Sequence, residues 1–178
     1  MKNNIVALVS DALVRSGSTF REDKKQAYRQ AIEQETNEKA KWVLQTILDN
    51  AAVAENERSP LCDDTGIPHL VLEIGPNRAV TGQMLDDIRE GVRQGLRSLP
   101  GRPMGIMGDD GQRIDQSGGL DADAAGVEAA PILLRHCNED VIRLHILMLN
   151  KKVLPLHRLM ALSALEALQA LEKLSFCV

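Results

Sequence analysis

A short run near residue 60 combines several side-chain groups that are common in catalytic and metal-binding sites: a thiol, two carboxylates and a hydroxyl. It reads Ser59-Pro60-Leu61-Cys62-Asp63-Asp64-Thr65-Gly66-Ile67-Pro68, a turn that lies between two prolines. A thiolate is a soft metal ligand, adjacent carboxylates can bind a cation or a substrate, and glycine lets the backbone approach a bound group closely. The run therefore predicts a functional site.

Two interpretations of this run stay open from the residues alone. In the first, Cys62 is a thiolate bound to an iron–sulfur cluster or another soft metal, while Asp64 and the backbone near Gly66 face a substrate. In the second, Asp63 and Asp64 accept hydrogen bonds in an Asx-type turn, and the thiol of Cys62 packs inside.

The other residues that could bind a metal show no local motif. Neither Cys137 nor Cys177 has the Cys-x-x-Cys spacing of a metal site. No two of the histidines have the spacing of a zinc motif, and a single histidine is more often a structural residue. The four histidines are His69, His136, His145 and His157. We assign no role to them or to the acidic pairs near residues 109 and 121.

The periodicity of apolar residues predicts the elements that hold the Cys62 run. Helical spacing covers the first sixty residues in three segments, the third of which has an N-cap candidate at Asn37, and Thr81 can cap a fourth helix. Apolar runs of strand character follow at 69–74, 130–135 and 141–149, and the last two are expected to form a hairpin. A final helix is expected over 162–174. The fold class is therefore α+β: helices lead through the cysteine turn into a small mixed sheet, with further helices packed on it.

Composition limits the class of protein. The chain has 178 residues, and we expect one domain over 1–178, made of a helical segment 1–58, a central part 59–149 and a terminal helix segment 150–178. Aromatic residues make up only 2% and the net charge is -4, which argues against nucleic acid as a partner. No apolar run reaches the ~18 residues of a membrane span, and three scattered cysteines fit a reducing compartment. We expect a cytoplasmic protein without a signal peptide.

With these residues laid out, the chain resembles the alpha subunit, or N-terminal portion, of class I fumarases and L-tartrate dehydratases. The resemblance rests on a helix, then Pro-x-Cys-x-Asp-Thr-Gly, then a strand, seen here as residues 59–66 in their setting. It extends more loosely through the helix from Thr81, the Pro100-Gly101-Arg102 turn and the strands at 130–149.

The resemblance implies an iron–sulfur hydro-lyase that eliminates water from a 2-hydroxy dicarboxylic acid. Its cofactor would be a [4Fe–4S] cluster held by three cysteines, with one iron open to the substrate. Cys62 would be the first cluster ligand, Asp63 and Asp64 would contact the substrate, and Arg102 would pair with a carboxylate. The general base would lie in a beta portion, so a beta-type partner chain, a homo-oligomer or both are expected.

Three features depart from the family pattern. Asp63 stands where such families carry glutamine and brings a negative charge close to a dianionic substrate. Lys151 and Lys152 stand where the family has a glycine-rich loop. Neither Cys137 nor Cys177 lies in a motif that matches the second and third cluster ligands, which the family carries beyond the length of this chain.

These departures leave an alternative open. The chain could be a non-catalytic binding or regulatory module that keeps the fold without a cluster, using its leucine-faced terminal helix to dock. A third interpretation is a redox or divalent-metal protein that uses Cys62 together with aspartates. The catalytic residues and the hydroxy acid are not determined by the sequence.

Overall fold

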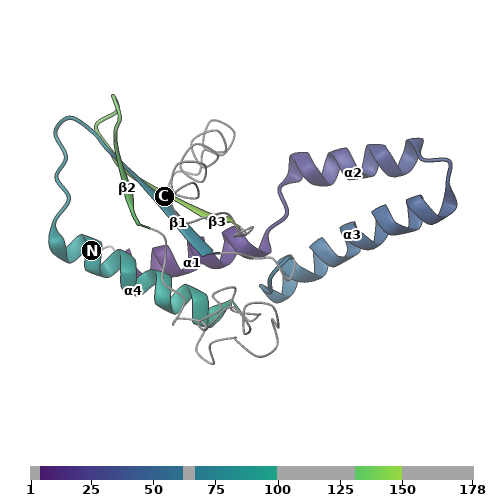
Figure 1. Ribbon diagram of the computed structural model, residues 1–178, viewed down its shortest axis with the longest axis horizontal. Helices are drawn as coiled ribbons and strands as arrows, with labels where there is room; N and C mark the ends of the chain where they lie inside the picture. Colours follow the sequence, from purple (N-terminus) through teal and green to yellow (C-terminus); the bar gives the residue numbers. More distant parts are fainter. Residues whose placement is uncertain (1–4, 62–66, 100–130, 150–178) are drawn as a thin grey trace, which may run out of the picture.

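The computed structural model describes residues 5–61, 67–99 and 131–149 of the chain. Within these ranges the chain forms four helices and a three-stranded sheet, and three of the helices precede the first strand (Figure 1). The elements are α1 Ile5–Ser18, α2 Glu22–Gln34, α3 Glu38–Glu57, β1 Ile67–Ile74, α4 Gly82–Ser98, β2 Leu133–His136 and β3 Ile142–Leu149. The expected α+β class is confirmed, as are the three N-terminal helices and the helix that follows Thr81.

Local hydrogen bonds explain where the predicted helices begin. The side-chain oxygen of Asn37 accepts the backbone N–H groups of Lys39 and Ala40, and the Thr81 hydroxyl accepts that of Met84. Each contact satisfies a donor that would otherwise have no partner in the first turn of the helix. Both caps expected from the sequence are therefore confirmed.

The hydrophobic core lies between the sheet and a layer made of α1 and α4. Leu70 and Leu72 of β1 point into it, and Leu13 of α1 is completely buried there. The remaining buried members of the core come from α1, α4 and the residue after α4: Val9, Val14, Ile88, Val92, Leu96 and Leu99. Alternate residues of a strand face opposite sides, so the odd-numbered residues of β1 belong to the other face of the sheet.

Two glycines let α1 and α4 approach each other closely. A Cβ atom built on Gly91 would lie 2.6 Å from the Cβ of Val9, and one on Gly95 would lie 3.0 Å from the Cβ of Leu13. From Gly91 to Gly95 the contact moves four residues toward the carboxyl end of α4, and from Val9 to Leu13 it moves four residues toward the carboxyl end of α1. The two helices therefore run parallel. Their carboxyl ends consequently lie at the same end of the molecule.

The expected β2–β3 hairpin is wrong, because β1 lies between these two strands. The sheet order is β2-β1-β3, with β2 parallel and β3 antiparallel to β1. The chain from Cys137 to Val141 crosses over the end of β1, where the Gly75 N–H donates to the carbonyl of Val141. A Cβ on Gly75 would lie 2.1 Å from the carbonyl oxygen of Glu139. Only glycine leaves room for this crossing.

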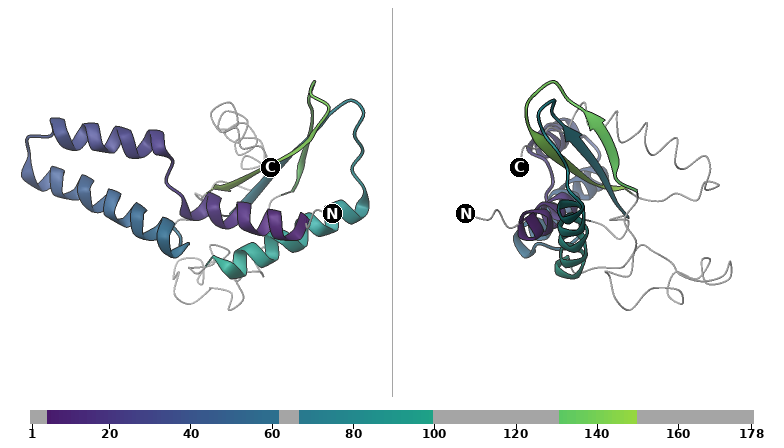
Figure 2. Two further views of the ribbon diagram at one scale, coloured as in Figure 1. Left: turned by 180° about the vertical axis from the view of Figure 1, so that it is seen from behind. Right: turned by 90° about the vertical axis from the view of Figure 1, so that its left-hand side faces the viewer.

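The helices α2 and α3 form an antiparallel pair that extends away from the sheet and from α1 (Figures 1 and 2). No residue of α2 is buried, as expected for a surface helix, and α3 buries only Ala51 and Ala54. After α3, Arg58 takes a left-handed conformation with φ 52° and ends the helix. The pair is thus joined to the rest of the molecule mainly at one end.

Two expectations fall outside the described residues and stay predictions: the irregular segment at 101–126 and the terminal helix at 162–174. The division of one domain into 1–58, 59–149 and 150–178 also stays a prediction. Among the residues that the model describes, no helix is long and apolar enough to cross a membrane.

Candidate functional site

Cys62, Asp63 and Asp64 lie outside the described residues, but both ends of their segment are described. On the amino-terminal side, the Leu61 N–H donates to the carbonyl of Gly17 at 3.0 Å. The side-chain amide of Asn50 donates to the carbonyl of Leu61 at 2.9 Å. These bonds fix Leu61 between the carboxyl end of α1 and the middle of α3. The Cα of Cys62 follows within about 3.8 Å.

On the other side, the segment leads directly into the sheet. Ile67 begins β1 and pairs with Leu149, the last residue of β3. The described end of β3 therefore lies beside the start of β1, which follows the Cys62 run in the sequence. In the resemblance the segment after β3 is the glycine-rich loop, and here it contains Lys151 and Lys152.

Arg102 also lies outside the described residues, three positions after Leu99. Because α1 and α4 run parallel, Leu99 lies beside the carboxyl end of α1, where it joins the buried core. Three residues of chain reach at most about 11 Å. The described ends of the segments that carry Cys62, Arg102 and Lys151 thus meet at one end of the α1–α4 layer (Figure 1).

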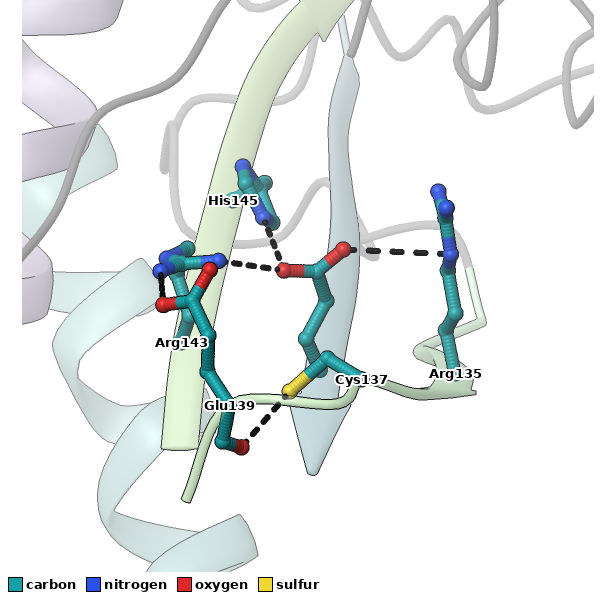
Figure 3. A network of polar contacts seen from close by, with 6 residues as sticks. Arg135, Cys137, Glu139, Arg143 and His145 are labelled. Carbon is teal, nitrogen blue, oxygen red and sulfur yellow. Dashed lines mark hydrogen bonds and ion pairs between the residues drawn. The ribbon is translucent and has the colours of Figure 1, made fainter. Parts of the chain in front are cut away.

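A network of charged residues occupies the opposite end of β1 (Figure 3). Glu73 stands at its centre and accepts a hydrogen bond from Nη1 of Arg143 at 2.9 Å. The Nε2 atom of His145 lies 3.3 Å from the same carboxylate oxygen, and Nε of Arg135 lies 3.8 Å from the other. The second guanidinium nitrogen of Arg143 donates to Glu139 at 2.6 Å. All three strands of the sheet, and the link over Gly75, contribute to this network.

Burial and charge act in opposite directions on Glu73. Burial alone would raise the pKa of its carboxyl, but the contacts with His145 and Arg143 outweigh burial and hold the pKa below its ordinary value. His145 is 8% exposed, and its Nε2 makes no aligned hydrogen bond despite the short approach to Glu73. The two side chains are therefore in contact without an aligned hydrogen bond.

This network stabilises the sheet more readily than it could perform a reaction. The carboxylate of Glu73 is already shared by two guanidinium groups, so it is a poor proton acceptor. The sequence reasoning missed the network, although Arg143 and His145 alternate with apolar residues along β3. That alternation indicates one polar face, but the partner on β1 becomes visible only once the two strands are paired.

His69 lies on the same face of β1, near the Cys62 end. It is half-buried, and burial lowers the pKa of its imidazole, so the neutral form is favoured at pH 7. It pairs across the sheet with Leu147. A structural role, as expected from the sequence, suits this position.

Cys137 is the one cysteine within the described ranges, and it lies far from the Cys62 segment. Its backbone N–H donates to Ile74 and its Sγ lies 3.4 Å from the carbonyl oxygen of Glu139, both at the crossing end of β1. Ile67 and Glu73 are six residues apart, about 20 Å along a strand. Over the described residues, no three His, Cys, Asp or Glu side chains are grouped to hold a metal ion.

An open groove of about 450 Å³ lies between α2 and α3. Lys25 and Arg29 contribute its cationic side chains, but Lys25 is paired with Glu55 and Arg29 with Glu22. These pairs neutralise the groove, so its charge does not attract an anion.

Comparison with known proteins adds two findings. The family model described as Fumarate hydratase (Fumerase) matches residues 6–149. A protein of Methanocaldococcus jannaschii named "Putative L(+)-tartrate dehydratase subunit alpha" is 37% identical over 84 residues. This match covers 46% of the present chain and 30% of the relative. The family match includes the whole Cys62 run and all three strands.

Proposed function

The chain belongs to the fumarate hydratase family, and from this premise we propose that it is the alpha-type part of a hydro-lyase acting on a 2-hydroxy dicarboxylic acid. The family match over residues 6–149 carries this proposal, because it contains the cysteine run and the elements that position it. A beta-type partner chain, as the name of the relative suggests, would complete the enzyme.

We assign the binding roles to the end of the molecule where three segment ends meet. Cys62 would be a thiolate ligand of a [4Fe–4S] cluster, Asp63 and Asp64 would hydrogen-bond the substrate, and Arg102 would pair with one of its carboxylates. When bound, such a cluster supplies an iron that acts as a Lewis acid on the substrate. The convergence of Leu61, Leu99 and Leu149 supports this assignment.

The described residues do not supply three cysteine ligands for a cluster at this end of the molecule. Cys137 is at the crossing end of β1, about 20 Å from the start of that strand. Further thiolates would have to come from outside the described ranges or from a partner chain. The same observation favours the alternative, a binding module that keeps the fold without a cluster.

Anaerobic reconstitution with iron and sulfide distinguishes a cluster-binding hydro-lyase from a binding module without a cluster. We expect wild-type protein to take up iron and sulfide and to show the visible absorbance of a cluster. Cys62→Ala should lose this absorbance, and Cys137→Ala should keep it, since Cys137 lies at the other end of the sheet. No uptake by the wild type, or equal uptake by Cys62→Ala, would favour the module without a cluster.

Activity requires a second measurement. The reconstituted chain, with any chain that co-purifies, is incubated with fumarate, L-malate and tartrate. Water addition is followed by the loss, and water elimination by the gain, of the absorbance of the unsaturated acid. We expect Asp64→Asn to lower turnover at least tenfold while the cluster absorbance is retained. Equal turnover in wild type and Asp64→Asn contradicts the assigned role of Asp64.

A further inference from the structure

Leu61, the last described residue before Cys62, is held by two helices at once. Its backbone N–H donates to the carbonyl of Gly17, near the end of α1, at 3.0 Å. Its carbonyl accepts a hydrogen bond from the side-chain amide of Asn50, on α3, at 2.9 Å. Both hydrogen-bonding groups of the Leu61 backbone therefore have a partner, and the two partners belong to different helices.

The two residues before Leu61 are restricted as well. The Ser59 N–H donates to the carbonyl of Ala54 at 2.9 Å and so continues the end of α3. Pro60 follows, and its ring restricts φ to about −65°. The chain therefore reaches Cys62 from a short segment with little rotational freedom, and the contacts of Leu61 are the last that the structure describes before the thiol.

The position of Asn50 in α3 indicates that its side chain serves this contact. Asn50 is exposed and lies inside the helix, about two turns before its end. Asparagine is a weaker helix former than alanine at such a position. A carbonyl oxygen can only accept a hydrogen bond, so the Leu61 carbonyl requires a donor, which the amide provides.

We propose that Asn50 is a positioning residue for the Cys62 thiol, on which it acts through the Leu61 carbonyl. That carbonyl belongs to the peptide group that joins Leu61 to Cys62. The peptide group is planar and includes the Cα of Cys62, so the hydrogen bond from Asn50 orients the plane from which the cysteine side chain projects. The α2–α3 pair is thereby linked to the candidate site. This inference rests on the proposed function only in giving the Cys62 thiol a ligand role.

The reactivity of the Cys62 thiol tests the proposal without iron, substrate or a beta-type chain. Folded protein is treated with 4,4′-dithiodipyridine, and modified Cys62 and Cys137 are quantified separately by peptide mass. Asn50→Asp should raise the Cys62 rate at least threefold at pH 7, because the carboxylate repels the Leu61 carbonyl and releases the turn. Asn50→Ala, which only lacks the donor, should also raise it. The Cys137 rate should stay that of the wild type.

Asn56→Asp is the matched control for the added charge. Asn56 is also exposed on α3 and is closer to Cys62 in sequence, but its amide donates to the side chain of Glu57 at 2.9 Å. The substitution adds the same negative charge to the same helix and should leave the Cys62 rate unchanged. Circular dichroism checks that each variant keeps its helices.

Acid should reverse the effect of Asn50→Asp. The ordinary pKa of an aspartate is about 3.9, and the protonated carboxyl carries an O–H that can donate to the Leu61 carbonyl. The ratio of the Asn50→Asp rate to the wild-type rate should therefore fall toward one at about pH 4, whereas the ratio for Asn50→Ala should not. General loosening of α3 would not respond to this protonation.

Three results would overturn the proposal: a Cys62 rate that does not rise in Asn50→Asp at pH 7, a rate that rises equally in Asn56→Asp, or a ratio that acid does not lower. Each is read from the iron-free protein. Absence of iron uptake by the wild type, in contrast, counts against the proposed function and leaves the role of Asn50 in holding the thiol unaffected.

Discussion

The two helix pairs of this chain pack in opposite ways. The α1–α4 pair meets through Gly91 and Gly95 and buries Leu13 completely, whereas α2 buries no residue and α3 buries only two alanines. Apolar residues recur with helical spacing in both pairs, so amphipathic pattern alone does not distinguish them. The difference indicates that the α1–α4 layer and the sheet hold the fold together, while the α2–α3 pair presents a surface.

The largest difference between the two pairs is expected in the free energy of unfolding when a leucine or isoleucine is truncated to alanine. Leu13→Ala should lower the free energy of unfolding by about 3–5 kcal/mol, because the removed side chain is fully buried and leaves a cavity. Leu8→Ala, in the same helix but 46% exposed, should cost about 1 kcal/mol or less. Ile47→Ala on α3 should have a similarly small effect. Urea unfolding at low protein concentration measures all three.

One result in that series would contradict the difference between the α1–α4 pair and the α2–α3 pair. If Ile47→Ala destabilises the protein as much as Leu13→Ala, the α2–α3 pair belongs to the same cooperative core as α1 and α4.

A smaller effect is expected where the helices of the first pair touch. A methyl group at Gly91 would approach the Cβ of Val9 to 2.6 Å and the carbonyl oxygen of Val6 to 2.8 Å. Gly91→Ala should therefore destabilise the protein by about 1–3 kcal/mol, through forced separation of α1 and α4. Gly82→Ala is the matched control, because a Cβ there meets no atom within 4 Å. It should be neutral or stabilising by up to about 1 kcal/mol. Thermal unfolding that ranks the two variants in the reverse order contradicts close packing at Gly91.

The smallest expected effect concerns pH and compares a buried with an exposed carboxylate. The pKa of Glu73 is held below 4.5 in the folded state, so an unfolded chain takes up the proton first. The stabilisation is complete above pH 4.5 and is lost as the pH falls through the folded pKa. Glu73→Gln should remove this slope and cost about 1 kcal/mol at neutral pH, because the guanidinium of Arg143 loses one charged acceptor but keeps its bond to Glu139.

Glu22 on α2 provides the control for the pH experiment. A hydrogen bond from Arg29 also lowers the pKa of Glu22, but this carboxyl is fully exposed, and Glu22→Gln should leave the slope unchanged. His69 acts in a different window: burial lowers its pKa from 6.5, so its contribution falls as the pH drops below 6.5. Unfolding measured from pH 7 to 3 separates these windows. An unaltered slope below 4.5 in Glu73→Gln would show that the network does not couple folding to pH.

Much of the local structure could be predicted from sequence because its causes are local. Asn37 and Thr81 were predicted as caps from their position before an apolar period, and each accepts hydrogen bonds from residues two or three positions away. The strand at 69–74 and the apolar run at 141–149 were identified from composition in the same way. Contacts between residues this close in sequence can be recognised from the sequence alone.

The pairing of strands was not predictable in this way. Proximity in sequence favoured a β2–β3 hairpin, but β1 takes the position between them because Gly75 allows the connecting chain to cross its end. The Glu73 network depends on that order, so it was missed as well. For the candidate site, the roles of Cys62, Asp63, Asp64 and Arg102 stay predictions. The fold adds that the described residues next to these positions lie at the same end of the molecule.

The central position of β1 also has a consequence for how the protein is made. Its two partner strands follow it by some sixty residues or more, since Val71 pairs with Leu133 and Ile74 with Ile142. On the ribosome, β1 must wait with both edges unpaired until β2 and β3 have emerged. Such late, long-range pairing slows folding and exposes strand edges to association. Helices α1 and α4, complete earlier in synthesis, can cover one face of the waiting strand.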